Sequence, residues 1–231
     1  MIYPRPKPTS EFTLLPGDIF ACFGADRGSR FISLQTSWHS WIAGPARLRW
    51  SPSHVAIACP RYAPHNQQQY WVESCSTGHR PCLERRKAVS GCQVHHPSDR
   101  IRDYTQAGGR VDLYRLTPIN RLTGHSESQM RQDLIGWFVK NEVGYDSAAA
   151  IFSGTRVVKV LEKLVQFWPS DPHAVFCSQL LAAELQSLCR MNKDNPIHYN
   201  PGRLMRLLVY QGTYSYHTTF TSPDDSRLEL L

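Results

Sequence analysis

The sequence contains no apolar run approaching the roughly 20 residues that a membrane-spanning helix requires. Its N-terminus, Met1 to Pro8, carries charges and prolines but no apolar segment of the kind found in secretory signals. The seven cysteines are odd in number and irregularly spaced, and no Cys-x-x-Cys pair occurs, which argues against a disulfide framework. These absences predict a protein made in the reducing cytoplasm, and they are compatible with delivery to the cell envelope by a route that reads no N-terminal signal.

Charged residues are also scarce, at 19% against a typical figure of about 25%, yet 26 bases outnumber 19 acids. Much of this excess lies in residues 80–110, where seven basic residues meet three acidic ones. The stretch predicts either a solvated loop or a contact with an anionic surface such as phosphate headgroups or cell-wall polymer. Nucleic acid is disfavoured as a partner, because no basic helix, zinc finger or RNA-binding aromatic pattern accompanies the charge.

The apolar pattern predicts a strand-rich first half and a helix-rich second half. Short buried strands are expected at 19–23, 55–59, 69–74 and 110–116, with a last strand or two within 207–216. Helices are expected at 30–41, 126–141 and 157–168, and from residue 176 onward. Residues 76–108, rich in Gly, Pro, Arg and His, are predicted to be mostly loop.

This order of elements predicts an α+β protein. Residues 1–13 are expected to form an extended Pro-rich arm, because alternating prolines exclude helix and most strand pairing. Residues 14–220 are expected to form a single domain, and residues 221–231 a flexible acidic tail. Two domains divided near residue 120 are the alternative.

Three residues stand on elements that suit nucleophilic catalysis. Cys177 lies at the start of an apolar helix, where the positive end of the helix dipole favours thiolate over thiol. His54 opens a strand and is a natural partner to take the thiol proton, while Glu73 on the next strand can orient the imidazole. Backbone N–H groups at the start of the helix, including that of Ser178, are candidate donors to an oxyanion. Gln35 or Tyr145 could add a side-chain donor.

Four segments occur in an order that resembles a known family. They are Leu15-Pro16-Gly17-Asp18-Ile19, Ser53-His54-Val55-Ala56-Ile57, Val72-Glu73-Ser74 and Phe176-Cys177-Ser178-Gln179-Leu180. Together they are similar to the circularly permuted branch of the NlpC-type, papain-like cysteine hydrolases, which is related to the lecithin:retinol acyltransferases. The resemblance covers about residues 15–208 and implies a permuted papain-like fold, with an antiparallel sheet packed against a helical C-terminal half. Gln179 departs from it, since many members carry glutamate there.

The resemblance implies hydrolysis or transfer of an acyl group through a thioester, with no cofactor. Cys177 would be the nucleophile, His54 the general base and acid, and Glu73 the orienting group, with Tyr145 as a substrate or oxyanion contact. The substrates that it implies are peptidoglycan peptides, lipids or N-acyl amides. The net positive charge favours peptidoglycan, whose polymers are anionic. Lipids or N-acyl amides are favoured by three tryptophans that could line an acyl groove or, alternatively, pack in the core: Trp38, Trp41 and Trp50. The alternative is a catalytically silent component of a larger assembly.

The remaining thiols have less specific interpretations. Six potential zinc ligands crowd one stretch: Cys75, His79, Cys82, Cys92, His95 and His96. Zinc ligands are usually paired at spacings of two to four residues, which these residues match only in part, so no metal is expected. Cys189 is expected to be a core residue of the Cys177 helix.

Overall fold

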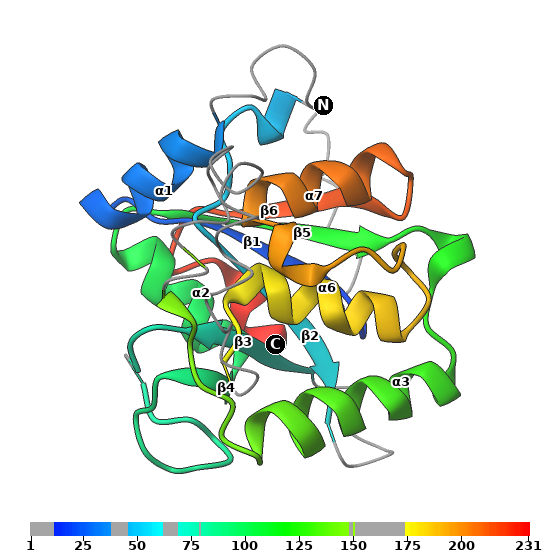
Figure 1. The fold of residues 1–231 in the computed structure, drawn as a ribbon. Coiled ribbons are helices and arrows are strands. Elements are labelled where there is room, and N and C mark those ends of the chain that lie inside the picture. Colours follow the sequence, from blue (N-terminus) through cyan, green and yellow to red (C-terminus); the bar gives the residue numbers. More distant parts are fainter. Residues whose placement is uncertain (1–11, 38–45, 62–68, 79, 148–149, 151–173) are drawn as a thin grey trace, which may run out of the picture.

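Six strands form one sheet in the order β4-β3-β2-β1-β5-β6 (Figure 1). The structure is a computed structural model that describes residues 12–37, 46–61, 69–78, 80–147, 150 and 174–231. The strands are β1 (Ile19–Phe23), β2 (His54–Pro60), β3 (Gln69–Cys75), β4 (Gly91–His95), β5 (Arg110–Leu116) and β6 (Tyr214–Phe220). All neighbouring strands pair antiparallel, so the predicted α+β class with an antiparallel sheet is confirmed.

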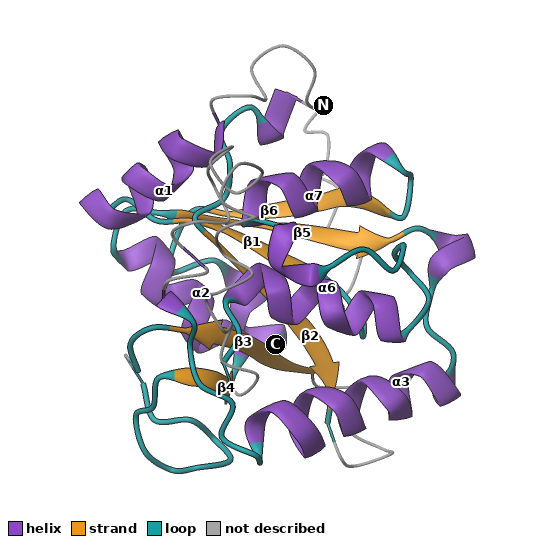
Figure 2. Cartoon of the chain, in the orientation of Figure 1, coloured by secondary structure: helices purple, strands orange, loops and turns teal. Residues whose placement is uncertain are grey.

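Five α-helices accompany the sheet in the described ranges (Figure 2). They are α1 (Arg27–Ser37), α2 (Pro97–Gln106), α3 (Gly124–Arg131), α6 (Cys177–Ser187) and α7 (Pro201–Tyr210). The chain continues from α3 into a π-helical stretch, Gln132–Val139, without a break. Helices α3, α6 and α7 pack on one face of the sheet and α2 on the other, as the two core clusters show.

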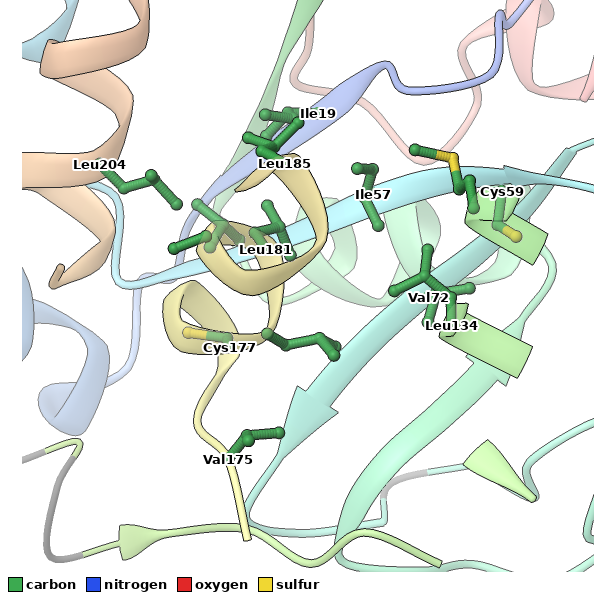
Figure 3. Close-up of a cluster of buried hydrophobic side chains, with 14 of the residues drawn as sticks. Ile19, Ile57, Cys59, Val72, Leu134, Val175, Cys177, Leu181, Leu185 and Leu204 are labelled. Atoms are coloured by element: carbon green, nitrogen blue, oxygen red, sulfur yellow. The ribbon is translucent and has the colours of Figure 1, made fainter. Parts of the chain in front are cut away.

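Alternation along each strand divides the core between the two faces. In β1, Ile19 and Ala21 join the larger cluster, whereas Phe20 and Cys22 join the smaller one. This is the period of two that sends successive strand residues to opposite faces. Figure 3 shows the larger cluster, in which leucines of α6 pack on apolar residues of β1, β2 and β3. The packing fixes the start of α6 against the middle of the sheet.

Two stretches were predicted incorrectly because their local signals are ambiguous. The stretch 76–108, expected to be loop, contains β4 and α2, the latter beginning at Pro97. Proline there ends the strand, but its fixed φ also suits the first position of a helix. Residues 207–216 were expected to be strand, yet α7 runs to Tyr210 and β6 begins at Tyr214. The Asn200 side chain accepts a hydrogen bond from the N–H of Arg203 at 2.8 Å and starts that helix.

The C-terminal residues differ from the flexible tail that the sequence predicts. Residues Ser226–Leu230 form a 3-10 helix, and Leu228 is 2% exposed in the smaller core cluster. Arg227 ties this helix to the sheet by donating to the carbonyl of Thr219 at 2.9 Å. The Pro-rich arm up to residue 11 and the helix expected at 157–168 lie outside the described residues. In the ranges that are described, no helix has the length and apolarity needed to cross a membrane.

Candidate active site

Cys177 is the first residue of α6, in agreement with the sequence prediction. The preceding residue, Phe176, is extended, and its N–H donates to the side-chain oxygen of Gln179 at 3.4 Å. Gln179 therefore closes the first turn of the helix, a task that an amide performs as well as a carboxylate. One residue earlier, the N–H of Val175 donates to the carbonyl of Gly144 at 3.0 Å. These contacts hold the run that leads into Cys177.

The structure brings together the three residues predicted to be catalytic. His54 is the first residue of β2, and Glu73 lies on the adjacent strand β3. The imidazole Nε2 of His54 is 2.8 Å from Oε2 of Glu73, whose side chain is completely buried. The Cys177 thiol interacts electrostatically with the imidazole, since it raises the pKa of His54, and the imidazole keeps 13% of its side chain exposed. The sheet and the start of α6 thus bring thiol, imidazole and carboxylate together.

The electrostatics of these three groups favour a charged thiol. Burial raises the pKa of Cys177, but the neighbouring His54 charge and hydrogen bond, with the N–H groups of Val55 and Ser178, outweigh it. The pKa of Cys177 therefore lies below its ordinary value. Burial lowers the pKa of His54, but the charges of Cys177 and Glu73 leave it well above its ordinary value. A thiolate–imidazolium pair is the state that these shifts favour.

Glu73 has a second partner, which sequence reasoning missed. The Arg100 side chain on α2 donates from Nε to Oε1 of Glu73 at 2.8 Å, and it is only 5% exposed. Burial raises the pKa of Glu73, but the charge of Arg100 and the hydrogen bond from His54 hold it well below its ordinary value. Arg100 also donates to Asp103 at 3.0 Å, and Asp103 accepts from Arg80 at 2.8 Å. The carboxylate that orients His54 is therefore fixed by an ion-pair network that reaches the surface.

A tyrosine on the same helix completes the surroundings of the imidazole. The ring of Tyr104 lies nearly parallel to that of His54, with centroids 6.4 Å apart and an interplanar angle of 19°. The guanidinium of Arg100 lies 5.4 Å from the centre of the Tyr104 ring. The spacing of Arg100, Asp103 and Tyr104 places the three side chains on one side of a helix. This spacing is the signal that could have revealed α2 as a supporting element.

The three additional candidates have different surroundings. The Ser178 hydroxyl donates to the carbonyl of Tyr199 at 2.6 Å and is fully buried, so only the backbone N–H of Ser178 lies at the sulfur. A substrate contact by this hydroxyl is therefore excluded in this conformation. Burial raises the pKa of Tyr145, and the charge of the Cys177 thiol acts in the same direction. The side chain of Gln35 is not among those that the structure describes.

The cysteines and histidines of the 75–96 stretch have separate environments. Cys82 and Cys92 are buried in the larger core cluster. His95 and His96 are hydrogen-bonded to different side chains. His79 lies outside the described residues. Among the residues that are described, no three His, Cys, Asp or Glu side chains gather as a metal site requires.

One other expectation is corrected by the structure. Cys189 is exposed and not a core residue, because α6 ends at Ser187 and Cys189 follows it with a φ of 55°. Some of the basic residues of 80–110 make contacts within the protein. Arg100 is buried against Glu73, and Arg85 donates to the backbone carbonyl of Val139 at 2.7 Å. Part of the positive charge in this stretch therefore serves internal contacts. Of the three tryptophans, Trp50 is 52% exposed, and Trp38 and Trp41 lie outside the described residues.

Comparison with known proteins assigns the chain to no family and gives it no function. No protein-family model matches the chain, and no curated protein matches it significantly. The chain is similar to the crystal structure of the metalloprotein yiiX from Escherichia coli O157:H7, DUF1105, with a TM-score of 0.46 and 14% identity over 93% of each chain. A similarity of this size assigns neither a fold family nor a function.

Proposed function

We propose that the protein is a cysteine hydrolase that cleaves an amide or ester bond through a thioester on Cys177. The observation that supports this proposal is the His54–Glu73 pair, with 2.8 Å between the imidazole and the carboxylate, beside a Cys177 thiol whose pKa the imidazole lowers. Nucleophile, base and orienting group in this arrangement are the parts that acyl transfer requires. A permuted papain-like fold belongs to the same proposal, because the histidine strand precedes the cysteine helix along the chain.

In the proposed reaction, the Cys177 thiolate attacks the carbonyl carbon, and a C–S bond forms as the carbonyl electron pair moves to oxygen. The backbone N–H of Cys177, in the first turn of α6, is available to this oxyanion. The tetrahedral intermediate collapses when His54 gives its proton to the leaving nitrogen or oxygen. His54 then takes a proton from water, which attacks the thioester and releases the acid and the thiolate. Glu73 holds the imidazole in position through both steps.

Trapping of the acyl-enzyme tests this proposal. The protein is mixed with a p-nitrophenyl acyl ester, quenched in acid and mapped by mass spectrometry. We expect one acyl group on the Cys177 peptide and loss of turnover in Cys177→Ala and in His54→Ala. Cys189→Ala is the matched control, because Cys189 is exposed and follows the C-terminal end of α6, whereas Cys177 begins the helix. Acylation of Cys189 in preference to Cys177, or full turnover in Cys177→Ala, would falsify the assignment.

The proposed substrates are peptidoglycan peptides or lipid and N-acyl compounds. Incubation with purified sacculi and, separately, with labelled lipids distinguishes them by the released product. The alternative function, a silent member of a larger assembly, predicts no release from either substrate and no acylation by the activated ester. The low pKa of Cys177 favours the enzyme, because a packing cysteine in an apolar site has a raised pKa, as Cys92 does at about 12.

A further inference from the structure

Helix α1 presents its large apolar side chains to solvent and its small polar ones to the protein. Phe31, Ile32 and Leu34 are 63%, 40% and 54% exposed, whereas Thr36 and Ser37 are 8% and 1% exposed. A surface helix of a globular protein normally has the opposite arrangement, with its apolar stripe facing the core. We therefore expect the exposed apolar face of α1 to bind a partner, because contiguous exposed apolar side chains mark interaction sites.

Hydrogen bonds fix α1 in this orientation. The Ser37 hydroxyl accepts from the N–H of Ser51 at 2.8 Å, which ties the end of the helix to the chain before β2. The guanidinium of Arg206 on α7 donates to the carbonyl of Thr36 at 3.3 Å and to the hydroxyl of Ser51 at 3.0 Å. Rotation of the helix to bury Phe31 would break these bonds. The side of α1 that carries Thr36 and Ser37 is therefore held against the protein by these hydrogen bonds.

Two arginines lie on the same side of α1 as Phe31 and Leu34. At about 100° per residue, Arg27, Arg30, Phe31 and Leu34 fall on one side of the helix. Both arginines are exposed. The one acidic residue next to the helix, Asp26, lies before its start and accepts from the N–H of Ser29 at 2.9 Å. Exposed apolar side chains with arginines beside them supply the two contributions to binding at a membrane interface, buried apolar area and attraction to anionic lipids.

This surface adjoins the candidate active site. Strand β1 ends at Phe23, just before α1, and its residue Cys22 pairs with His54 at the start of β2. The N–H of Gly24 then donates to the hydroxyl of Ser53, the neighbour of His54, at 3.2 Å. Helix α1 therefore leaves the sheet at the end where the imidazole lies, and it projects from that end in Figure 1.

We propose that α1 docks the protein on an anionic lipid bilayer, with Phe31 and Leu34 among the acyl chains and Arg27 and Arg30 at the phosphates. A bilayer accepts shallow insertion of a single helix face to a depth of about 5–10 Å. A stable protein partner would need about 800 Å² on each side, more than three side chains of one helix offer. A second copy bound symmetrically would also bring the same arginines together. Docking would bring the site to lipid esters or amides, a consequence that rests on the proposed function.

Co-sedimentation with vesicles tests the docking. The full chain is mixed with vesicles of phosphatidylglycerol and phosphatidylcholine in equal parts, or of phosphatidylcholine alone. We expect binding to the anionic vesicles that weakens with added salt. The double variant Phe31→Ser/Leu34→Ser should lower the partition coefficient by about tenfold or more, because each buried side chain contributes substantially to transfer. Arg27→Glu/Arg30→Glu should lower it by a similar factor.

Matched control variants distinguish binding through α1 from non-specific binding to vesicles. Ile119→Ser removes a side chain that is 92% exposed elsewhere, and Lys193→Glu reverses an exposed charge. Both should bind vesicles as the wild type does, and all variants should keep the wild-type melting temperature. Equal binding by the Phe31/Leu34 variant, or equal affinity for the two vesicle types, would refute the docking. A dimer in light scattering that the double variant abolishes, without vesicle binding, would also refute it.

One further variant keeps the two proposals apart. Cys177→Ala leaves α1 unchanged, so it should bind anionic vesicles like the wild type while losing turnover of the activated ester. Failure of ester turnover in the wild type would remove the proposed function and leave the vesicle result standing. Conversely, a wild type that turns over the ester but ignores vesicles would remove the docking alone.

Discussion

Replacing Arg100 by glutamine tests how the orienting carboxylate is held. Arg100 donates to Glu73 at 2.8 Å and to Asp103 at 3.0 Å, and its side chain is 5% exposed. The variant leaves a fully buried carboxylate without its arginine partner. Removing one member of a buried ion pair costs about 3–5 kcal/mol, because the remaining charge stays desolvated. We expect a loss near the lower limit, about 3 kcal/mol, since His54 still contacts Glu73 at 2.8 Å.

The assay is urea unfolding followed by circular dichroism at neutral pH. Arg102→Gln is the matched control, because it makes the same change two residues away on α2 at a position that is not buried. It should change the free energy of unfolding by less than about 0.5 kcal/mol. A loss below about 1 kcal/mol in Arg100→Gln would refute the argument that Arg100 compensates the buried charge of Glu73.

The pH dependence of the free energy of unfolding gives an independent check of the role of Arg100. The folded pKa of Glu73 lies well below its ordinary value, mainly because burial is outweighed by the charge of Arg100. Its stabilising contribution is therefore present above the unfolded pKa, about 4.3, and is lost as the pH falls through the folded pKa. Without Arg100 the folded pKa rises, so the loss begins at higher pH. The difference between the variant and the wild type should be largest near neutrality and shrink in acid. A constant difference would contradict the linkage.

Three further predictions concern stability. Burial and the charge of Asp133 raise the pKa of Glu184 to about 9, and both its oxygens lack a hydrogen-bond partner in the described part of the chain. Because the folded pKa is raised, stability should fall between about pH 5 and 9, and Glu184→Leu should flatten this slope and add about 1–3 kcal/mol at pH 8 in urea unfolding. Leu228→Ala should cost about 2–5 kcal/mol in the same assay, since Leu228 is 2% exposed; a cost near zero would mean that the tail is not packed. Ser178→Ala should lower stability by about 1 kcal/mol through loss of the 2.6 Å bond to Tyr199, while ester turnover persists; loss of turnover at unchanged stability would restore a substrate role for the hydroxyl.

The parts of the fold that could be predicted from sequence are those with an unambiguous local pattern. Strands β1, β2, β3 and β5 have short apolar runs bounded by turn residues, and their predicted positions agree with the structure to within a residue. The helix start at Cys177 was predicted because an apolar stripe begins there. The relation of His54 to Glu73 followed from their adjacent strands.

The missed elements depend on contacts between distant residues. The glycines and prolines of residues 76–108 suggested a loop. Gly91, however, is the first residue of β4 and takes a φ of 101°. A side chain at this position would collide with the carbonyl of Val143. Arg100 was counted as surface charge because nothing local reveals its partner. Glu73 lies 27 residues away in sequence and meets Arg100 only when β3 and α2 pack together. Burial of a charge is a tertiary property, and a sequence pattern does not contain it.

The most direct test of the account is the pH dependence of alkylation at Cys177. Iodoacetamide labelling is followed residue by residue by mass spectrometry, with the exposed Cys189 as the internal reference. Because His54 and the backbone N–H groups lower the pKa of Cys177, its rate should remain high below neutral pH and exceed that of Cys189. In His54→Ala the advantage should disappear. A Cys177 that reacts no faster than Cys189 at any pH, or equally fast without His54, would contradict the claim that this thiol is an activated nucleophile.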